Sequence, residues 1–233
     1  MMHLYLEHIV AGVGVTLLIA LGSLLIAIVL GLFGAVCKLS DFKLLHLVSD
    51  AYSTIVRGVP ELVWMLFLFF GAQIWLNQLI GWLNGWMEVD SIDIDPMIAG
   101  IVTIGFIYGA YMTETFRGAL LAVPAGQREA GLSLGMSRFQ VFFRIILPQM
   151  VVHALPGFAN NWMVLVKSTA LVSVLGVSDL MHRASLAKSA TGNAFGVYLA
   201  VCLVYLAITS VSIWLLRLCE QRFSRGIRKA VSA

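Results

Sequence analysis

Five long apolar runs constrain the fold of this 233-residue chain more than any other feature. A helix needs about 20 predominantly apolar residues to cross the roughly 30 Å hydrocarbon core of a membrane, and the runs approach or exceed that length. Hydrophobic residues make up 60% of the chain and charged residues 12%, whereas a soluble domain has about 45–50% and 25%. The sequence therefore predicts an all-α integral membrane protein with about five transmembrane helices. The runs cover residues 9–36, 59–83, 97–115, 154–177 and 195–216.

The first run is expected to stay in the protein as a helix. It has no basic stretch before it and no small-residue cleavage site after it, as a secretory signal peptide would have. Its glycines suit close packing between helices in lipid. They are Gly12, Gly14, Gly22, Gly31 and Gly34.

The positions of lysine and arginine predict the orientation, because loops rich in these residues stay in the cytoplasm. Basic residues follow the first, third and fifth runs, whereas the loop after the second run is acidic between residues 88 and 95. Arg183 and Lys188 fall on the predicted outer side but are outnumbered. We therefore expect the N-terminus outside and the C-terminus in the cytoplasm. The basic residues are Lys38, Lys43, Arg117, Arg128, Arg138, Arg144, Arg217, Arg222, Arg225, Arg228 and Lys229.

Charge and cysteine usage narrow the class further. The formal net charge of +3 follows from this topology, and a nucleic-acid partner would need a basic, water-facing domain. Cys37, Cys202 and Cys219 lie in or beside the runs without redox or metal spacing, and the histidines show no mutual ligand spacing, so no metal site is predicted. No composition shift divides the chain, which predicts one membrane domain over residues 1–233.

Two shorter segments between the runs also carry a pattern. Apolar residues recur at helical spacing between Leu44 and Val56, which predicts a short amphipathic helix along the cytoplasmic interface. The acidic segment stops at Pro96, and proline suits the first turn of the third transmembrane helix.

The loop at residues 122–150 is polar, so it must face water. Pro124 opens it, residues 127–134 can form two helical turns, and Gly135 is a natural helix stop. Ser137 is a natural N-cap for a second helix, which Pro148 is expected to limit. The second helix carries an apolar stripe that either packs on the protein itself or faces a partner. The stripe consists of Phe139, Phe142, Phe143 and Ile146.

The spacing in this loop is Glu-Ala-x, three residues, Gly, nine residues, Ile-x-Leu-Pro. It resembles the signature loop of the permeases of ABC importers. Gly131 departs from that pattern, which more often has alanine, and is expected to loosen the first helix slightly. The matching residues are Glu129, Ala130, Gly135, Ile145, Leu147 and Pro148.

Further blocks at residues 57–60, 108–118, 123–124, 154–157 and 167–177 resemble the polar amino-acid permease family. The resemblance covers most of residues 52–180. Residues 92–96 and 160–162 resemble in particular the permease subunits for histidine, lysine, arginine and ornithine.

The resemblance implies a type I ABC importer permease fold in a bacterial inner membrane. Two permeases would form the pathway, the second being a homologous sister or another copy of this chain. Two cytoplasmic ATPases would hold ATP and magnesium, and an external solute-binding protein would deliver the substrate. The chain has no phosphate-binding Gly-x-x-x-x-Gly-Lys-Ser/Thr segment, so we expect a transport subunit without its own ATPase site or cofactor.

In such permeases the signature loop is the coupling helix that docks in a groove of the ATPase. ATP can move the permease only if this docking differs between two states, and a bulky residue in place of Gly135 is expected to uncouple hydrolysis from uptake. The residues implied in coupling are Glu129, Ala130, Gly135, Phe139, Phe142, Ile145, Leu147 and Pro148.

Three ionisable residues inside the runs are candidates for holding a polar, basic amino acid, because such residues usually face a bundle interior or a water-filled cavity. Glu61 is either a carboxylate stabilised by the positive N-terminal end of a helix dipole or a contact for the substrate cation. Glu114 either pairs with Arg117 or Lys167 or faces the cation. Lys167 either pairs with another helix or contacts the substrate carboxylate.

The remaining substrate candidates surround these three. Tyr111 shares a face with Glu114, and Ser168 and Thr169 are hydrogen-bond donors beside Lys167. Asn161 either bonds across helices or contacts substrate. Asp179 is a candidate outer-side contact for the binding protein or the substrate.

Two other classes remain as alternatives. An ion-coupled secondary transporter often has an inverted repeat, and none is recognisable in this sequence. A membrane-embedded enzyme would need a nucleophile with a base or a metal motif, and only scattered serine, threonine and histidine residues occur.

Overall fold

The computed structural model describes residue 7 and residues 9–83 and 93–223, and these form helices without any strand. The all-α prediction is confirmed. Five segments are long and apolar enough to cross a membrane, as expected: Val13–Lys38, Glu61–Trp82, Pro96–Ala122, Arg138–Leu175 and Ala194–Arg222. The helices are α2 (Val13–Lys38), α3 (Lys43–Gly58), α4 (Glu61–Leu83), α5 (Pro96–Ala122), α6 (Ala125–Ser133), α7 (Arg138–Val141), the π-helical turn η1 (Phe142–Ile146), α8 (Leu147–Ser168), the 3₁₀ segment η2 (Thr169–Leu175), α9 (Leu180–Thr191) and α10 (Ala194–Phe223).

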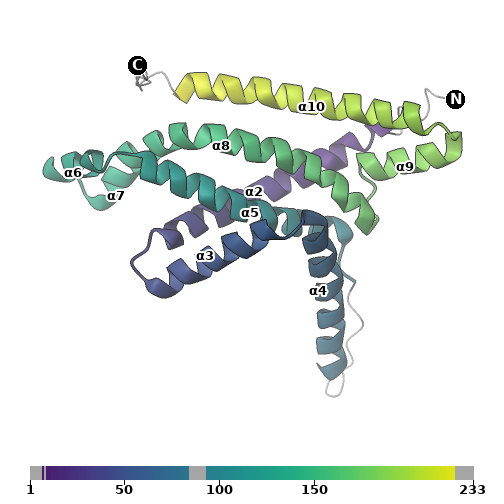
Figure 1. The fold of residues 1–233 in the computed structure, drawn as a ribbon, viewed down its shortest axis with the longest axis horizontal. Helices are drawn as coiled ribbons and strands as arrows, with labels where there is room; N and C mark the ends of the chain where they lie inside the picture. Colours follow the sequence, from purple (N-terminus) through teal and green to yellow (C-terminus); the bar gives the residue numbers. More distant parts are fainter. Residues whose placement is uncertain (1–6, 8, 84–92, 224–233) are drawn as a thin grey trace.

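Helices α2 and α5 cross at the centre of the bundle (Figure 1). Glycines bring them together: a Cβ on Gly31 would overlap Met112, and a Cβ on Gly105 would lie 2.6 Å from the Cβ of Ile26. Small residues allow such close backbone approach in lipid, where no hydrophobic effect drives helices together. Gly22, Gly31 and Gly34 of α2 are thus used for packing, as predicted, whereas Gly14 has open space around it.

The predicted amphipathic helix exists as α3, and its position along the membrane interface stays a prediction. It runs back beside α2 and α5 (Figure 1). Its polar face is turned inward, since Ser49 donates to the carbonyl of Gly34 at 2.8 Å and Tyr52 to that of Phe106 at 2.6 Å. The hydroxyls find partners inside the bundle, so its leucines are left on the exposed side.

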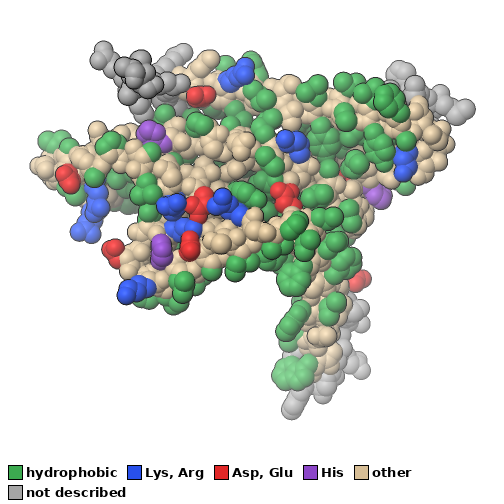
Figure 2. Space-filling view, viewed as in Figure 1, with side chains coloured by type: hydrophobic (Ala, Val, Ile, Leu, Met, Phe, Trp, Pro, Cys, Tyr) green, Lys and Arg blue, Asp and Glu red, His purple; other side chains and the backbone are tan. Residues whose placement is uncertain are grey.

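Helix α4 leaves the rest of the bundle and exposes mostly hydrophobic side chains (Figures 1 and 2). The next helix, α5, begins as predicted with Pro96 in its first turn. The carboxylate of Asp95 caps it by accepting from the backbone N–H groups of Met97 and Ile98 at 2.7 and 3.1 Å. Most of the acidic segment, residues 88–92, lies outside the described residues.

The polar loop forms a helix, a turn and a helix, as expected. Gly135 has the left-handed φ of +78°, and the Ser137 and Gln140 side chains form a capping box at the start of α7. The expectation that Pro148 limits the second helix is wrong, because the chain continues through it into α8. The preceding turn is π-helical, and its wider backbone accommodates a proline without the usual clash.

The loop α6–α7, the α2–α3 turn and the end of α10 lie at one end of the bundle, and α9 lies at the other (Figure 1). The predicted cytoplasmic segments are therefore gathered on one side. Which side faces the cytoplasm stays a prediction from charge.

Candidate functional site

Glu61, the first residue of α4, is held between two other helices. One carboxylate oxygen accepts from the hydroxyl of Tyr108 on α5 at 2.8 Å, and the other accepts from the hydroxyl of Ser168 at the end of α8. The two hydroxyls are 2.7 Å apart. A carboxylate that accepts from neutral hydroxyls keeps its full negative charge available for a cation.

Two tyrosines and an arginine extend this cluster. The ring of Tyr111 lies 5.6 Å from that of Tyr108, and the guanidinium of Arg57 is 5.5 Å from the centroid of the Tyr111 ring, in a cation–π contact. Tyr108 and Arg57 were not among the contacts predicted from the sequence. Both belong to the family-like blocks, and the spacing of Tyr108 and Tyr111 on one helix face was the available signal.

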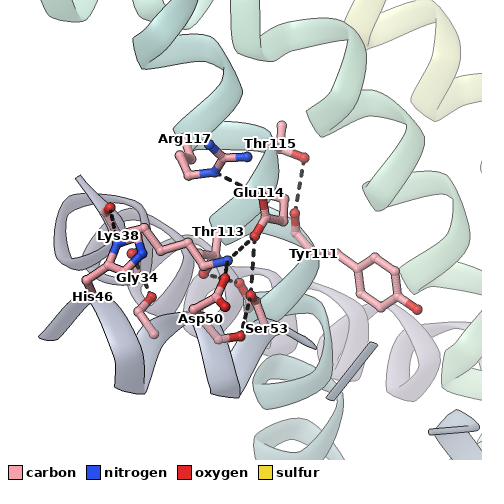
Figure 3. Close-up of polar contacts among 12 residues, drawn as sticks. Gly34, Lys38, His46, Asp50, Ser53, Tyr111, Thr113, Glu114, Thr115 and Arg117 are labelled. Atoms are coloured by element: carbon pink, nitrogen blue, oxygen red, sulfur yellow. Dashed lines mark hydrogen bonds and ion pairs between the residues drawn. The ribbon is translucent and has the colours of Figure 1, made fainter. Parts of the chain in front are cut away.

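Glu114 lies in a separate ion network with α2 and α3 (Figure 3). Lys38 contacts one of its carboxylate oxygens, and Arg117 donates to the other at 3.0 Å. Lys38 also donates to Asp50 at 2.8 Å, and Ser53 to Glu114 at 3.2 Å. Of the two alternatives for Glu114, the chain adopts the ion pair with Arg117, and the charge of the Glu114 carboxylate is already matched. Contact of Glu114 with a substrate stays a prediction.

The Lys38 contact also changes the ionisation of Asp50. The hydrogen bond and charge of that ammonium lower the pKa of the Asp50 carboxyl below its ordinary value. Lys38 was not predicted as a member of this network, because a lysine at the end of an apolar run indicates only which end of the helix faces the cytoplasm.

Lys167 was expected either to pair with another helix or to contact the substrate carboxylate, and the single chain does not show the pairing. Its side chain is exposed on the last turn of α8. Among the described residues no carboxylate lies within ion-pair distance of it. It stays a candidate for a ligand or a second subunit.

The other polar candidates are mostly committed to the fold. Asn161 is buried and donates to the hydroxyl of Thr115 at 2.9 Å, which is the cross-helix alternative. Thr169 is fully buried and donates to the carbonyl of Val166 at 2.7 Å. Their contact with substrate stays a prediction that this conformation does not support.

Asp179 does not lie on the outer surface. It is fully buried and caps α9, accepting from the backbone N–H of His182 at 2.8 Å. Burial raises the pKa of its carboxyl above the ordinary value. The predicted contact with a binding protein or the substrate would require the end of the bundle around α9 to open.

The polar loop exposes apolar side chains at its tip. Leu134 is 82% exposed and Phe139 71%, and the ring of Phe143 lies 4.4 Å from that of Phe139. Gly131 was expected to loosen α6 but is buried, and a Cβ there would lie 2.8 Å from both Val141 and Ile145. The glycine thus allows α6 to pack tightly on the next helix, and part of the apolar stripe is left for a partner.

Comparisons with known proteins agree with this architecture. The family model "Binding-protein-dependent transport system inner membrane component" matches residues 27–225. The histidine/lysine/arginine/ornithine transport system permease protein HisQ of Escherichia coli (strain K12) is 48% identical over 95% of this chain and 96% of its own length. The arginine ABC transporter permease protein ArtQ of the same strain is 36% identical over 93% and 94%.

Solved structures show the same fold. A crystal structure of an amino acid ABC transporter with histidines superposes with a TM-score of 0.78 at 31% identity, over 95% of this chain and 96% of that one. The inward-facing MetNI methionine ABC transporter superposes with a TM-score of 0.67 at 20% identity, over 96% and 97%, and supports the fold alone.

The chain therefore belongs to the family of binding-protein-dependent transport system inner membrane components. It is a multi-pass permease subunit of an ABC importer in the inner membrane, and ATP is hydrolysed by a separate subunit. Such a permease works with an ATPase, a substrate-binding protein and a second permease. This assignment decides against the ion-coupled secondary transporter.

Proposed function

We propose that this permease lines the path for basic amino acids, namely arginine, ornithine, lysine and histidine. They are delivered by an external solute-binding protein. The relatives named for histidine, lysine, arginine and ornithine and for arginine support this substrate class. The second permease is a homologous sister, and two cytoplasmic ATPases hold ATP and magnesium.

A stripe of exposed residues on α8, which includes the polar His153, Asn160 and Lys167, is the observation that carries this proposal. Exposed residues recur along the helix every three or four positions, so they share one face. Polar groups are costly against lipid and usually face a water-filled cavity or another subunit. We infer that this face borders the path at the second permease. The stripe consists of His153, Pro156, Asn160, Val164 and Lys167.

The Glu61 cluster supplies the contact for a cation. Its carboxylate compensates the charged side chain of the amino acid, while Tyr108 and Ser168 fix its orientation. Tyr111 offers a ring face to the same cation. Arg57 and Lys167 are the cationic groups for the substrate carboxylate. An amino acid carries both a cation and a carboxylate, so its site needs groups of both charges.

The loop at residues 122–150 docks on the ATPase and carries no chemistry. Leu134 and Phe139 are its most exposed large apolar side chains, so they form the contact surface together with Phe142. Glu129, with Ala130 beside it, is exposed on α6 and suits a charged contact at the edge of this surface. The remaining residues, Gly135, Ile145, Leu147 and Pro148, shape the loop.

Replacement of Glu61 tests the substrate site. Glu61→Gln removes the charge but keeps the shape, and hydrogen bonds to charged groups contribute about 1.5–3 kcal/mol. The dissociation constant of arginine from the purified complex, measured by equilibrium dialysis without binding protein, should rise roughly ten- to hundredfold. Glutamine binding should change little, because glutamine lacks a side-chain cation.

Asp41→Asn serves as the control, because Asp41 is an exposed carboxylate in the α2–α3 turn. It should leave arginine binding unchanged. An unchanged arginine affinity in Glu61→Gln would remove Glu61 from the site. Arginine uptake driven by an ion gradient in vesicles without ATP would contradict the transport mechanism itself.

A further inference from the structure

The ion network around Glu114 buries charge at some cost. The Lys38 side chain is 6% exposed and that of Glu114 22%. With Asp50 and Arg117 the network holds two cations and two anions, so its charge is balanced. Removing charged groups from water costs several kcal/mol each, and good geometry repays this only in part. A partly buried network of this kind, in which the Asp50 and Arg117 side chains stay 56% and 38% exposed, is weak evidence for a role in stability alone.

The helices that the network joins are already held together without it. Gly31 and Gly105 allow close contact of α2 with α5, and Ser23 on α2 donates to the carbonyl of Ile101 on α5 at 3.1 Å. Helix α3 is fixed by the Ser49 and Tyr52 hydrogen bonds to α2 and α5. These contacts hold the three helices together at positions on α5 that all precede Glu114, so the ion pairs lie nearer the docking loop than any of them.

Two members of the network, Glu114 and Arg117, lie on the chain between Glu61 of the proposed site and the docking loop at residues 122–150. Glu114 precedes the end of α5 by roughly two helical turns, and α6 of the docking loop follows directly. On the other side, α3 continues from Asp50 to its end at Gly58, and α4 then begins at Glu61. The ion pairs thus connect the helix that leads to the docking loop with the helix that leads to the carboxylate of the proposed site.

We propose that Lys38 and Glu114 form a joint that makes α5 and the α2–α3 hairpin move together when the docking loop is displaced. Both are positioning residues, which act on transport through Glu61 and the docking loop. An ion pair suits such a joint because it resists separation but tolerates small rotations. The inference rests on the proposed function.

The test compares four variants of the complete complex in proteoliposomes: Lys38→Met, Glu114→Gln, the double variant, and Lys38→Arg. The readout is amino-acid uptake per ATP hydrolysed, with the amino acid that the unmodified complex carries. Lys38→Met and Glu114→Gln, which each remove one charge, should each lower this ratio about two- to thirtyfold. This is the range by which residues between coupled sites modulate coupling. The affinity for the amino acid, measured by equilibrium dialysis, should stay unchanged.

The double variant distinguishes a joint from two separate effects. If the two residues act as one unit, Lys38→Met with Glu114→Gln should lower the ratio no further than the more harmful single variant. It also removes both charges together, so it leaves no unpaired partner in the pair and keeps the test valid if a single variant fails to assemble. Lys38→Arg, which retains the charge, should have a ratio closer to that of the unmodified complex.

Lys43→Met is the matched control, because Lys43 is an exposed lysine at the start of α3; it should keep the full ratio. A double variant with a normal ratio would overturn the joint. A double variant that lowers the ratio by the product of the two single reductions would also overturn it, because the residues would then act independently. A weakened amino-acid affinity in Glu114→Gln would overturn it too and would make Glu114 a substrate contact. Absence of any uptake of basic amino acids by the unmodified complex would reject the proposed substrate class but leave the ratio test in force.

Discussion

Gly135 shows how one residue can be required for its backbone conformation. Its φ is +78°, and no atom lies within 4 Å of the position where a Cβ would be. The sequence predicted that a bulky side chain would be harmful here. Within this chain a side chain at Gly135 has space, so we expect backbone conformation, and not size, to set the requirement, because the left-handed region costs other residues about 1–2 kcal/mol.

We expect Gly135→Ala and Gly135→Val to lower uptake per ATP hydrolysed by similar amounts. Both must adopt the same unfavourable φ or change the turn between α6 and α7. Gly135→Asn should be less harmful, because asparagine tolerates this region better. Transport and hydrolysis by the complex in proteoliposomes measure the effect.

Gly126→Ala is the control, since Gly126 lies within α6 with open space around it and no positive φ. It should keep normal coupling, and alanine is the better helix former. If Gly135→Val were far worse than Gly135→Ala, contact with the ATPase would set the requirement instead.

At the scale of elements, the packing of α2 against α5 depends on glycines whose partners the sequence could not name. Gly31 lies where a methyl group would overlap Met112, whereas Gly14 of the same helix has open space around it. The glycines of the first run are therefore not equivalent, although they look alike in the sequence. Only the neighbouring helix distinguishes them.

Gly31→Ala should destabilise the protein by about 1–3 kcal/mol, the usual cost of overpacking. Gly14→Ala should be neutral or slightly stabilising, because it adds helix propensity without a clash. Thermal unfolding of the purified complex in detergent compares the two variants. Equal melting temperatures would show that α2 and α5 do not pack this closely.

At the scale of the whole molecule, the docking loop, the α2–α3 turn and the end of α10 share one end of the bundle (Figure 1). The positive-inside rule predicts that this end is cytoplasmic. Acidic and basic side chains also gather over α3 and α5 near it (Figure 2). The sidedness can therefore be tested with residues from the two ends.

In a chain whose native cysteines are replaced, Ser189→Cys on α9 should react with a membrane-impermeant thiol reagent added to right-side-out spheroplasts. Lys43→Cys at the α2–α3 turn should react only in inside-out vesicles. Both residues are exposed, so access depends on the side of the membrane. The reverse labelling pattern would invert the orientation.

The sequence by itself determined the fold class, the five membrane helices, the helix–turn–helix of the docking loop and the class of transporter. These depend on local patterns: apolar length, proline and glycine positions, caps and a short motif. Tertiary structure decided which charges meet. Lys38 lies 76 residues from Glu114 and Ser168 lies 107 from Glu61, and no local rule connects residues that far apart. Burial likewise depends on neighbouring helices, which is why Lys167 proved exposed and Asp179 buried.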